Sequence, residues 1–196
     1  MIIVISFEET IPNETKIINQ LFLEGLDLFH VRKPFISDQE MKDFLSQINE
    51  SFWPQLVLHS HFELAKEYGI SRLHFRESDR INDSYQMYIK ENMISTSVHD
   101  IDTFNSLGQE WEYAFVSPFF PSISKRGYGN ETTILEESKA SNNPNVKLVA
   151  LGGITDKNMK EARGAGADGV ALLGAIWQSE NPLEVFQRCR ENKMNY

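Results

Sequence analysis

Short apolar runs alternate with amphipathic segments along the whole chain. The apolar runs are rich in Val, Ile, Leu and Phe, which is typical of buried strands. The run at 148–151 has no polar alternation, as expected for a parallel strand that is buried on both faces. The pattern predicts eight strands, at 2–6, 28–32, 55–59, 72–75, 93–98, 113–117, 148–151 and 169–173.

The segments between these runs place apolar residues at helical spacing. In the first of them Ile18 and Leu21 share one face of a helix. Ser37 with Glu40 three residues later predicts a capping box at the start of the second. The helices are expected at 14–24, 38–48, 62–68, 82–91, 100–107, 131–140, 157–163 and 182–191, and the longest loop at 118–130.

Eight consecutive strand-helix units favour an α/β fold, a single closed (β/α)8 barrel. The 196 residues are few for such a barrel, whose usual size is about 250, so the loops must be short. Because periodicity does not report closure, an open doubly wound sheet is the alternative. No linker or change of composition divides the chain, so residues 1–196 are expected to form one domain.

Glycines follow the last two predicted strands. Gly152 and Gly153 end one strand, Gly174 ends the next, and Thr155 is the expected N-cap of the helix between them. Strand ends with exposed N–H groups can cradle an anion, as the phosphate site of a (β/α)8 barrel does. The alternative is that these glycines only allow tight turns.

Composition and charge narrow the choice of function. The net charge of −9 argues against a nucleic-acid surface, which needs clustered Lys and Arg. No stretch approaches the length of a membrane span and the N-terminus does not resemble a signal peptide, so a cytoplasmic protein without membrane contact is expected. The single cysteine, Cys189, excludes an internal disulfide.

Polar residues follow the predicted strands where the active site of a barrel would lie. All five histidines are among them, which suggests proton transfer and phosphate binding. His59 and His61 have the spacing of metal ligands on one face of a strand, but no further ligands complete a zinc set. The candidates are His30, Arg32, Lys33, His59, Ser60, His61, His74, Arg76, Asp79, Ser97, His99, Ser117, Ser122, Ser124, Lys125 and Arg126.

Five segments make the pattern specific: LFHVRKP, LVLHSHFELA, LHFRESD, SPFFPSISKRG and ALGGIT with GADGVALLGAI. In order and spacing they resemble the thiamine phosphate synthase family, which includes the TenI-type thiazole tautomerases. The resemblance covers the chain from end to end. It implies a compact (β/α)8 barrel that joins hydroxymethylpyrimidine diphosphate to hydroxyethylthiazole phosphate and releases pyrophosphate with the help of Mg²⁺.

The resemblance also implies roles for individual residues. The pocket for the thiazole phosphate corresponds to Ser122, Ser124, Gly153, Leu173 and Gly174. The diphosphate side corresponds to Arg32, Ser97 and Lys125. Asp79 stands at the position of one of the family's two magnesium-binding carboxylates. Small phosphorylated pyrimidine and thiazole substrates are thus the expected partners. A homodimer is the expected assembly, because two-fold dimers are the commonest oligomers of soluble proteins.

The chain departs from the family pattern on the diphosphate side. The family's usual Gln-x-Arg-x-Lys motif is replaced in this chain by the residues from His30 to Pro34. The second cation of that motif is therefore absent or displaced to Lys33. The usual Asn-Asp pair is His59-Ser60, which removes a magnesium carboxylate and predicts a weak or substrate-assisted Mg²⁺ site.

Two alternatives to synthesis therefore stay open. The first is a TenI-like tautomerase in which His30, His59 or His61 supplies the acid and base. The histidine that those enzymes use after the sixth strand corresponds to Pro118, which counts against it. The second alternative is a non-catalytic binder of thiazole or thiamine phosphate.

Overall fold

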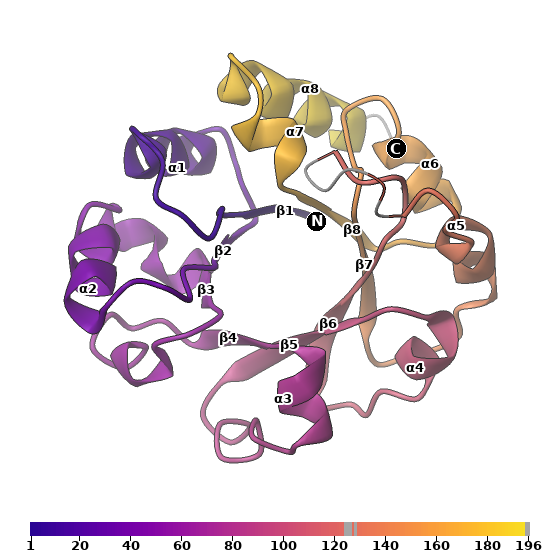
Figure 1. Cartoon of the computed structure of the whole chain (residues 1–196), viewed down its shortest axis with the longest axis horizontal. Helices are drawn as coiled ribbons and strands as arrows, with labels where there is room; N and C mark the ends of the chain where they lie inside the picture. Colours follow the sequence, from indigo (N-terminus) through magenta and orange to yellow (C-terminus); the bar gives the residue numbers. More distant parts are fainter. Residues whose placement is uncertain (124–126, 128, 195–196) are drawn as a thin grey trace.

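The chain folds into a closed barrel of eight parallel strands in the order of the sequence. The computed structural model describes residues 1–123, 127 and 129–194. Figure 1 shows the strands as a ring with the helices outside it. The strands are β1 Ile2–Ile5, β2 Leu28–Val31, β3 Leu56–Leu58, β4 Arg72–Phe75, β5 Met93–Val98, β6 Trp111–Val116, β7 Lys147–Leu151 and β8 Gly169–Leu172.

The ring closes between the first strand and the last. Ile3 of β1 lies opposite Ala171 of β8, and the N–H of Val170 donates to the carbonyl of Met1 at 3.0 Å. Because both edges of the sheet are paired in this way, no open edge remains between β1 and β8. The predicted (β/α)8 barrel is confirmed, and the open doubly wound sheet is excluded.

Helical segments connect the strands, and several are shorter than the sequence suggests. The α-helices are α1 Glu14–Leu23, α2 Asp38–Ser46, α3 Glu77–Ile81, α4 Ile101–Asn105, α5 Ile134–Glu137, α6 Met159–Gly164, α7 Gly174–Trp177 and α8 Pro182–Met194. The 3-10 helices are η1 Glu50–Gln55, η2 Phe62–Leu64 and η3 Ser138–Ala140. Within the described part of the chain, none of the helices has the length and apolar character needed to cross a membrane.

The predicted capping box begins α2. The Ser37 hydroxyl accepts from the N–H of Glu40, and the Glu40 carboxylate accepts from the N–H of Ser37 at 2.7 Å. Two N–H groups that the helix itself leaves unpaired are satisfied in this way.

The prediction of a helix at 82–91 is wrong. The helix in this connection is α3, Glu77–Ile81, and 82–91 form turns. Asp83 has a φ of 57°, in the left-handed region, so an α-helix cannot continue through it. Tyr85 nevertheless packs into the core, which explains why an apolar face seemed present in the sequence.

The start of α6 also differs from the expectation. The helix begins at Met159 with Asn158 as its N-cap, rather than at 157 with Thr155. Thr155 instead makes a turn before the helix, where its N–H donates to the Asn158 side chain at 2.7 Å. Polar residues of this kind satisfy turns as readily as helix ends, so the sequence did not distinguish the two.

The core has two layers, as a barrel requires. One lies inside the ring, and it holds Ile3, Ile5, Leu28, Val57, Tyr113, Phe115, Val149 and Ala171. The other lies between the strands and the helices. Apolar side chains of the strands are buried in both layers: Val57, Phe115, Val149 and Ala171 in the inner one, and Val4, Phe29 and Leu73 in the outer one.

Candidate functional site

A cavity of about 440 Å³ opens at the carboxyl ends of the strands. Its floor is the top of the inner core, including Ile5, Phe115 and Ala171. Its walls come from segments that follow several different strands, which is where a barrel carries its active site. A space of this size suits a small organic molecule.

Seven of the predicted site residues line this cavity together. They come from positions far apart in the sequence and meet only because the barrel closes. They are Arg32, His59, Ser97, Ser122, Gly153, Leu173 and Gly174. Ser124 and Lys125, which were predicted to complete the site, lie outside the described residues.

The Gly152-Gly153 turn has a packing requirement of its own. Both residues have positive φ, 98° and 63°. A Cβ on Gly153 would lie 2.3 Å from the carbonyl oxygen of Pro121, and one on Gly152 would lie 3.0 Å from Pro118. The glycines therefore let the loop after β6 lie directly on the end of β7, next to Ser122, whatever the cavity binds.

Three histidines form a cluster under the cavity. His30 Nδ1 lies 2.8 Å from His59 Nε2, and His30 Nε2 lies 2.7 Å from the hydroxyl of Tyr113. The His74 ring stacks on that of His59, with centroids 4.3 Å apart. His74 is held by two serines, since its Nδ1 and Nε2 each lie 2.9 Å from the hydroxyls of Ser95 and Ser97.

Burial keeps these imidazoles neutral. Desolvation lowers the pKa of His30 and His59 well below the usual value, and the charge of neighbouring groups adds to the effect. It also lowers the pKa of His74 to about 3, with a smaller contribution from Arg32. At neutral pH the cluster therefore offers uncharged ring nitrogens.

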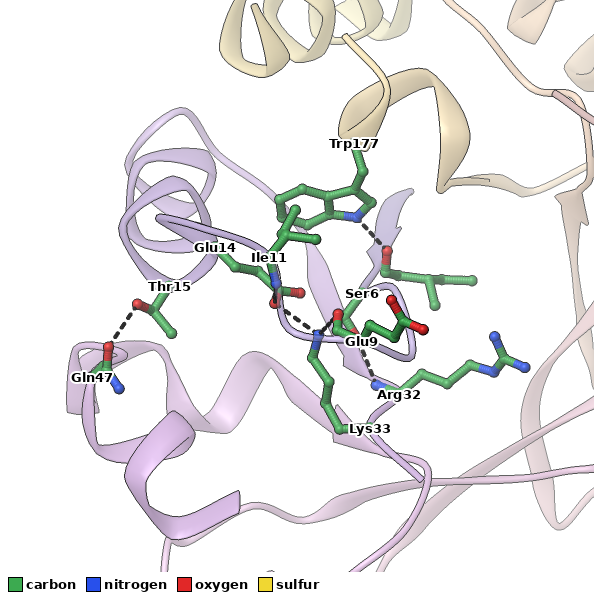
Figure 2. A network of polar contacts seen from close by, with 10 residues as sticks. Ser6, Glu9, Ile11, Glu14, Thr15, Arg32, Lys33, Gln47 and Trp177 are labelled. Atoms are coloured by element: carbon green, nitrogen blue, oxygen red, sulfur yellow. Dashed lines mark hydrogen bonds and ion pairs between the residues drawn. The ribbon is translucent and has the colours of Figure 1, made fainter. Parts of the chain in front are cut away.

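Arg32 and Lys33 follow β2 but point to different places (Figure 2). The Arg32 guanidinium pairs with Glu8 beside the cavity, and the backbone N–H of Arg32 donates to the Ser6 hydroxyl at 2.7 Å. Lys33 is fully buried, with Nζ 2.7 Å from both the Glu14 carboxylate and the carbonyl of Glu9. Lys33 is thus held in an ion pair behind the strand and does not supply the displaced cation.

Asp79 does not face the cavity. Its Oδ2 accepts from the N–H of Arg76 at 2.9 Å and lies 3.3 Å from Arg76 Nε, so the carboxylate caps α3. Among the described residues that line the cavity, the one carboxylate is Glu77, which pairs with Arg80 at 3.1 Å. Mg²⁺ prefers oxygen ligands in octahedral geometry, and the side chains placed here do not fit it.

His61 is separate from His59, although a shared face was expected. Its backbone has a φ of 55°, which turns the chain away from the strand direction. Its ring lies 2.9 Å from the carbonyl of Ile36 and 2.9 Å from the Ser60 hydroxyl. The expected face fails because β3 already ends at Leu58.

The cavity also contains residues to which the family resemblance assigned no role. His74, a strand-end candidate, and Phe115, a residue of the inner core, both line the cavity. His99 does so too, with Nδ1 2.9 Å from the carbonyl of Ser117. Alternation along β4 places His74 on the face opposite to that of Leu73, which packs in the outer layer.

Comparison with known proteins supplies a family. The family model for thiamine monophosphate synthase matches residues 2–176 of this chain. The thiamine-phosphate synthase of Anoxybacillus flavithermus is 28% identical over 141 residues, 70% of this chain and 64% of that protein. The thiamine-phosphate synthase of Staphylococcus haemolyticus is 26% identical over 174 residues, 85% of this chain and 82% of that protein.

Solved structures agree on the fold. A thiamine phosphate pyrophosphorylase from Bacteroides thetaiotaomicron has a TM-score of 0.76 at 24% identity, covering 100% of this chain and 98% of that one. One from Pyrococcus furiosus has a TM-score of 0.82 at 16% identity, covering 99% and 95%. A 3-hexulose-6-phosphate synthase from Salmonella typhimurium also matches, with a TM-score of 0.70 at 14% identity over 100% and 99% of the two chains. At such identities the likeness concerns the barrel alone.

Proposed function

The chain belongs to the thiamine monophosphate synthase family, and we propose that it forms thiamine phosphate from a pyrimidine diphosphate and a thiazole phosphate. The observation that carries the proposal is the cavity at the carboxyl ends of the strands. Six residues that match the family's substrate-binding positions converge on it, together with His59, where the chain departs from the family pattern. A site assembled from so many separate segments supports a substrate-binding role.

The proposed reaction needs no nucleophile from the protein. The C–O bond between the pyrimidine methylene and the diphosphate breaks, and its electron pair leaves with pyrophosphate. The lone pair of the thiazole nitrogen then forms the new C–N bond, so atoms and charge balance without a proton transfer. The protein contributes by holding the two substrates in line and by stabilising the departing negative charge.

Arg32 is the described cation best suited to the departing pyrophosphate. It lines the cavity, and its position is fixed by Ser6 and Glu8. A guanidinium can donate two parallel hydrogen bonds to phosphate oxygens. Ser97 also lines the cavity, and its hydroxyl is oriented by His74. We assign both to the diphosphate side.

The thiazole phosphate is assigned to the part of the cavity at the ends of β7 and β8. Ser122, Gly153, Leu173 and Gly174 line it, next to the turn that the loop after β6 covers. Backbone N–H groups at such turns bind phosphate oxygens, and a serine hydroxyl adds a donor. His59 and His74 beneath the substrates are neutral, so they add no charge to the site.

Magnesium dependence should be weak in this protein. Asp79, the matched carboxylate, is engaged by Arg76 and does not line the cavity. Any Mg²⁺ would then depend mainly on oxygens of the diphosphate itself, which is a substrate-assisted site.

Isomerisation of a thiazole phosphate is the second candidate, and the histidine cluster favours it. His59 reaches the cavity and is hydrogen-bonded through His30 to Tyr113, so a proton taken up at His59 has a route to buried groups. General acid-base chemistry of this kind needs no pyrophosphate. A protein that binds both substrates without converting either would be a simple binder.

Arg32→Gln tests the proposal. Thiamine phosphate formation is measured with both substrates, next to isomerisation of the thiazole phosphate alone. The variant should lose about 100-fold or more in kcat for synthesis, because a charged donor to the leaving group is removed. Arg188→Gln is the matched control, since Arg188 pairs with Asp156 and Glu184 on the outside of the barrel. Full synthetic activity in Arg32→Gln would overturn the assignment, and isomerisation without synthesis would favour the second candidate.

A further inference from the structure

The histidine cluster has the composition of a transition-metal site. His30 comes from β2, His59 from the residue after β3, and His74 from β4. One ring nitrogen of each lies within 4.8 Å of those of the other two. We propose that His30, His59 and His74 bind a divalent cation of the late first row, such as Zn²⁺ or Co²⁺.

The hydrogen bonds of the cluster match what such a site needs around it. A ligating histidine usually uses its second ring nitrogen to donate to a polar group, which fixes the ring. His30 can ligate through Nδ1 while Nε2 donates to the Tyr113 hydroxyl at 2.7 Å. His74 can ligate through Nε2 while Nδ1 donates to the Ser95 hydroxyl at 2.9 Å. His30 and His74 can therefore each present one ring nitrogen to the metal without leaving the other unpaired.

The spacing requires only side-chain adjustment. Nitrogens bound to one tetrahedral Zn²⁺ lie about 3.4 Å apart, given Zn–N distances of about 2.0–2.1 Å. His30 Nδ1 and His59 Nε2 are now 2.8 Å apart, because they share a hydrogen bond. The metal would replace that bond, and the ring of His74 would move toward it and away from Ser97. Burial favours the neutral form of all three rings, which is the form that ligates.

Three protein ligands leave a fourth position open. His59 and His74 line the cavity, so that position faces the substrate space and can take water or a phosphate oxygen. Three arginines, Arg32, Arg72 and Arg76, act on the cluster. They are paired with Glu8, Glu112 and Asp79, respectively. The residues around the site thus add little net positive charge to oppose the metal.

The ligand set distinguishes this site from a magnesium site. Imidazole nitrogens suit Zn²⁺, Co²⁺, Ni²⁺ and Cu²⁺, whereas Mg²⁺ prefers oxygen. The inference does not depend on the proposed synthesis, because metal binding can be measured without either substrate.

Cobalt absorption tests the proposal directly. The full-length protein is treated with a chelator, exchanged into buffer and titrated with Co²⁺ while the visible spectrum is recorded. We expect one equivalent to produce the intense visible bands of tetrahedral Co²⁺, and Zn²⁺ to abolish them. Millimolar Mg²⁺ should leave them unchanged. The absence of such bands at one equivalent would overturn the proposal, whatever the variants show.

Variants locate the site. His59→Gln should weaken Co²⁺ binding at least 10-fold. His61→Gln is the matched control, because that ring contacts Ile36 and Ser60 outside the cluster, and its binding should equal that of the wild type. Zn²⁺ should raise the melting temperature of the wild type and of His61→Gln but not of His59→Gln. Equal Co²⁺ affinity in folded His59→Gln and wild type would mean that the ion binds elsewhere and would overturn the assignment.

Discussion

Lys33 Nζ lies 2.7 Å from Glu14 Oε2, and both side chains are almost fully buried. The pair joins the end of β2 to the start of α1, and Nζ also donates to the carbonyl of Glu9 (Figure 2). Burial raises the pKa of Glu14 and lowers that of Lys33, while their contact opposes both shifts. Lys33, which the sequence suggested as a catalytic cation, is thus held by Glu14 in a structural ion pair.

Removing one member of this pair should destabilise the fold. Lys33→Met leaves a buried carboxylate without its cation, which typically costs about 3–5 kcal/mol. Replacing both residues, with Lys33→Met and Glu14→Leu, should restore most of the stability, because no buried charge is left. The measurement is urea denaturation. Lys42→Met, in the exposed pair with Glu67, should change the free energy of unfolding by no more than about 1 kcal/mol. A single variant as stable as the wild type would contradict the role given to Lys33.

Gly153 should tolerate no side chain. Gly153→Ala puts a Cβ against Pro121 in a backbone with positive φ, so the loop carrying Ser122 must move. We expect a loss of about 1–2 kcal/mol in stability from the backbone conformation, and weaker binding of thiazole phosphate. Gly164→Ala is the control, since no atom lies within 4 Å of the added Cβ. It should be neutral or stabilising by up to about 1 kcal/mol.

Denaturation and titration calorimetry measure the two effects separately. Unchanged affinity for thiazole phosphate in folded Gly153→Ala would show that the phosphate does not bind at this turn.

Asp100 should contribute stability that disappears in acid. Its carboxylate accepts from the N–H of Thr103 at the start of α4, and this hydrogen bond lowers its pKa. A carboxyl with a depressed folded pKa stabilises above its unfolded pKa of about 3.9, and the contribution is lost as pH falls through the folded value. Asp100→Ala should therefore cost about 1 kcal/mol at pH 7 and little near pH 2.

Denaturation of wild type and variant at several pH values checks this. Asp102→Ala, in the same helix, should show a smaller effect at pH 7 because Asp102 is not the N-cap. A cost for Asp100→Ala that is the same at both pH values would contradict the role of the charge.

The closed barrel was predictable because eight apolar runs leave few other arrangements of parallel strands. The positions of Ser122, Gly153 and Gly174 followed from the same logic, since strand ends meet at one edge of the sheet. Local turns were less predictable: Asp83 and His61 take left-handed backbones that no spacing rule indicates. The prediction of a helix at 82–91 failed because of the left-handed backbone of Asp83.

The roles of charged side chains depended on contacts that the sequence does not contain. Asp79 and Lys33 both follow strands and looked alike as site candidates. In the structure the Asp79 carboxylate accepts a hydrogen bond from Arg76, and Lys33 is buried in an ion pair with Glu14. Conversely, His30, His59 and His74 are up to 44 residues apart in the sequence (74 − 30), and only the pairing of β2, β3 and β4 brings them together.

We propose that two phosphorylated substrates react in this cavity to form thiamine phosphate. This proposal is tested most directly by incubating the wild-type protein with the pyrimidine diphosphate and the thiazole phosphate and measuring thiamine phosphate and pyrophosphate in the same samples. We expect equal molar amounts of the two products, and neither product when one substrate is omitted. A folded protein that binds thiazole phosphate but releases no thiamine phosphate, with or without added Mg²⁺, would contradict it.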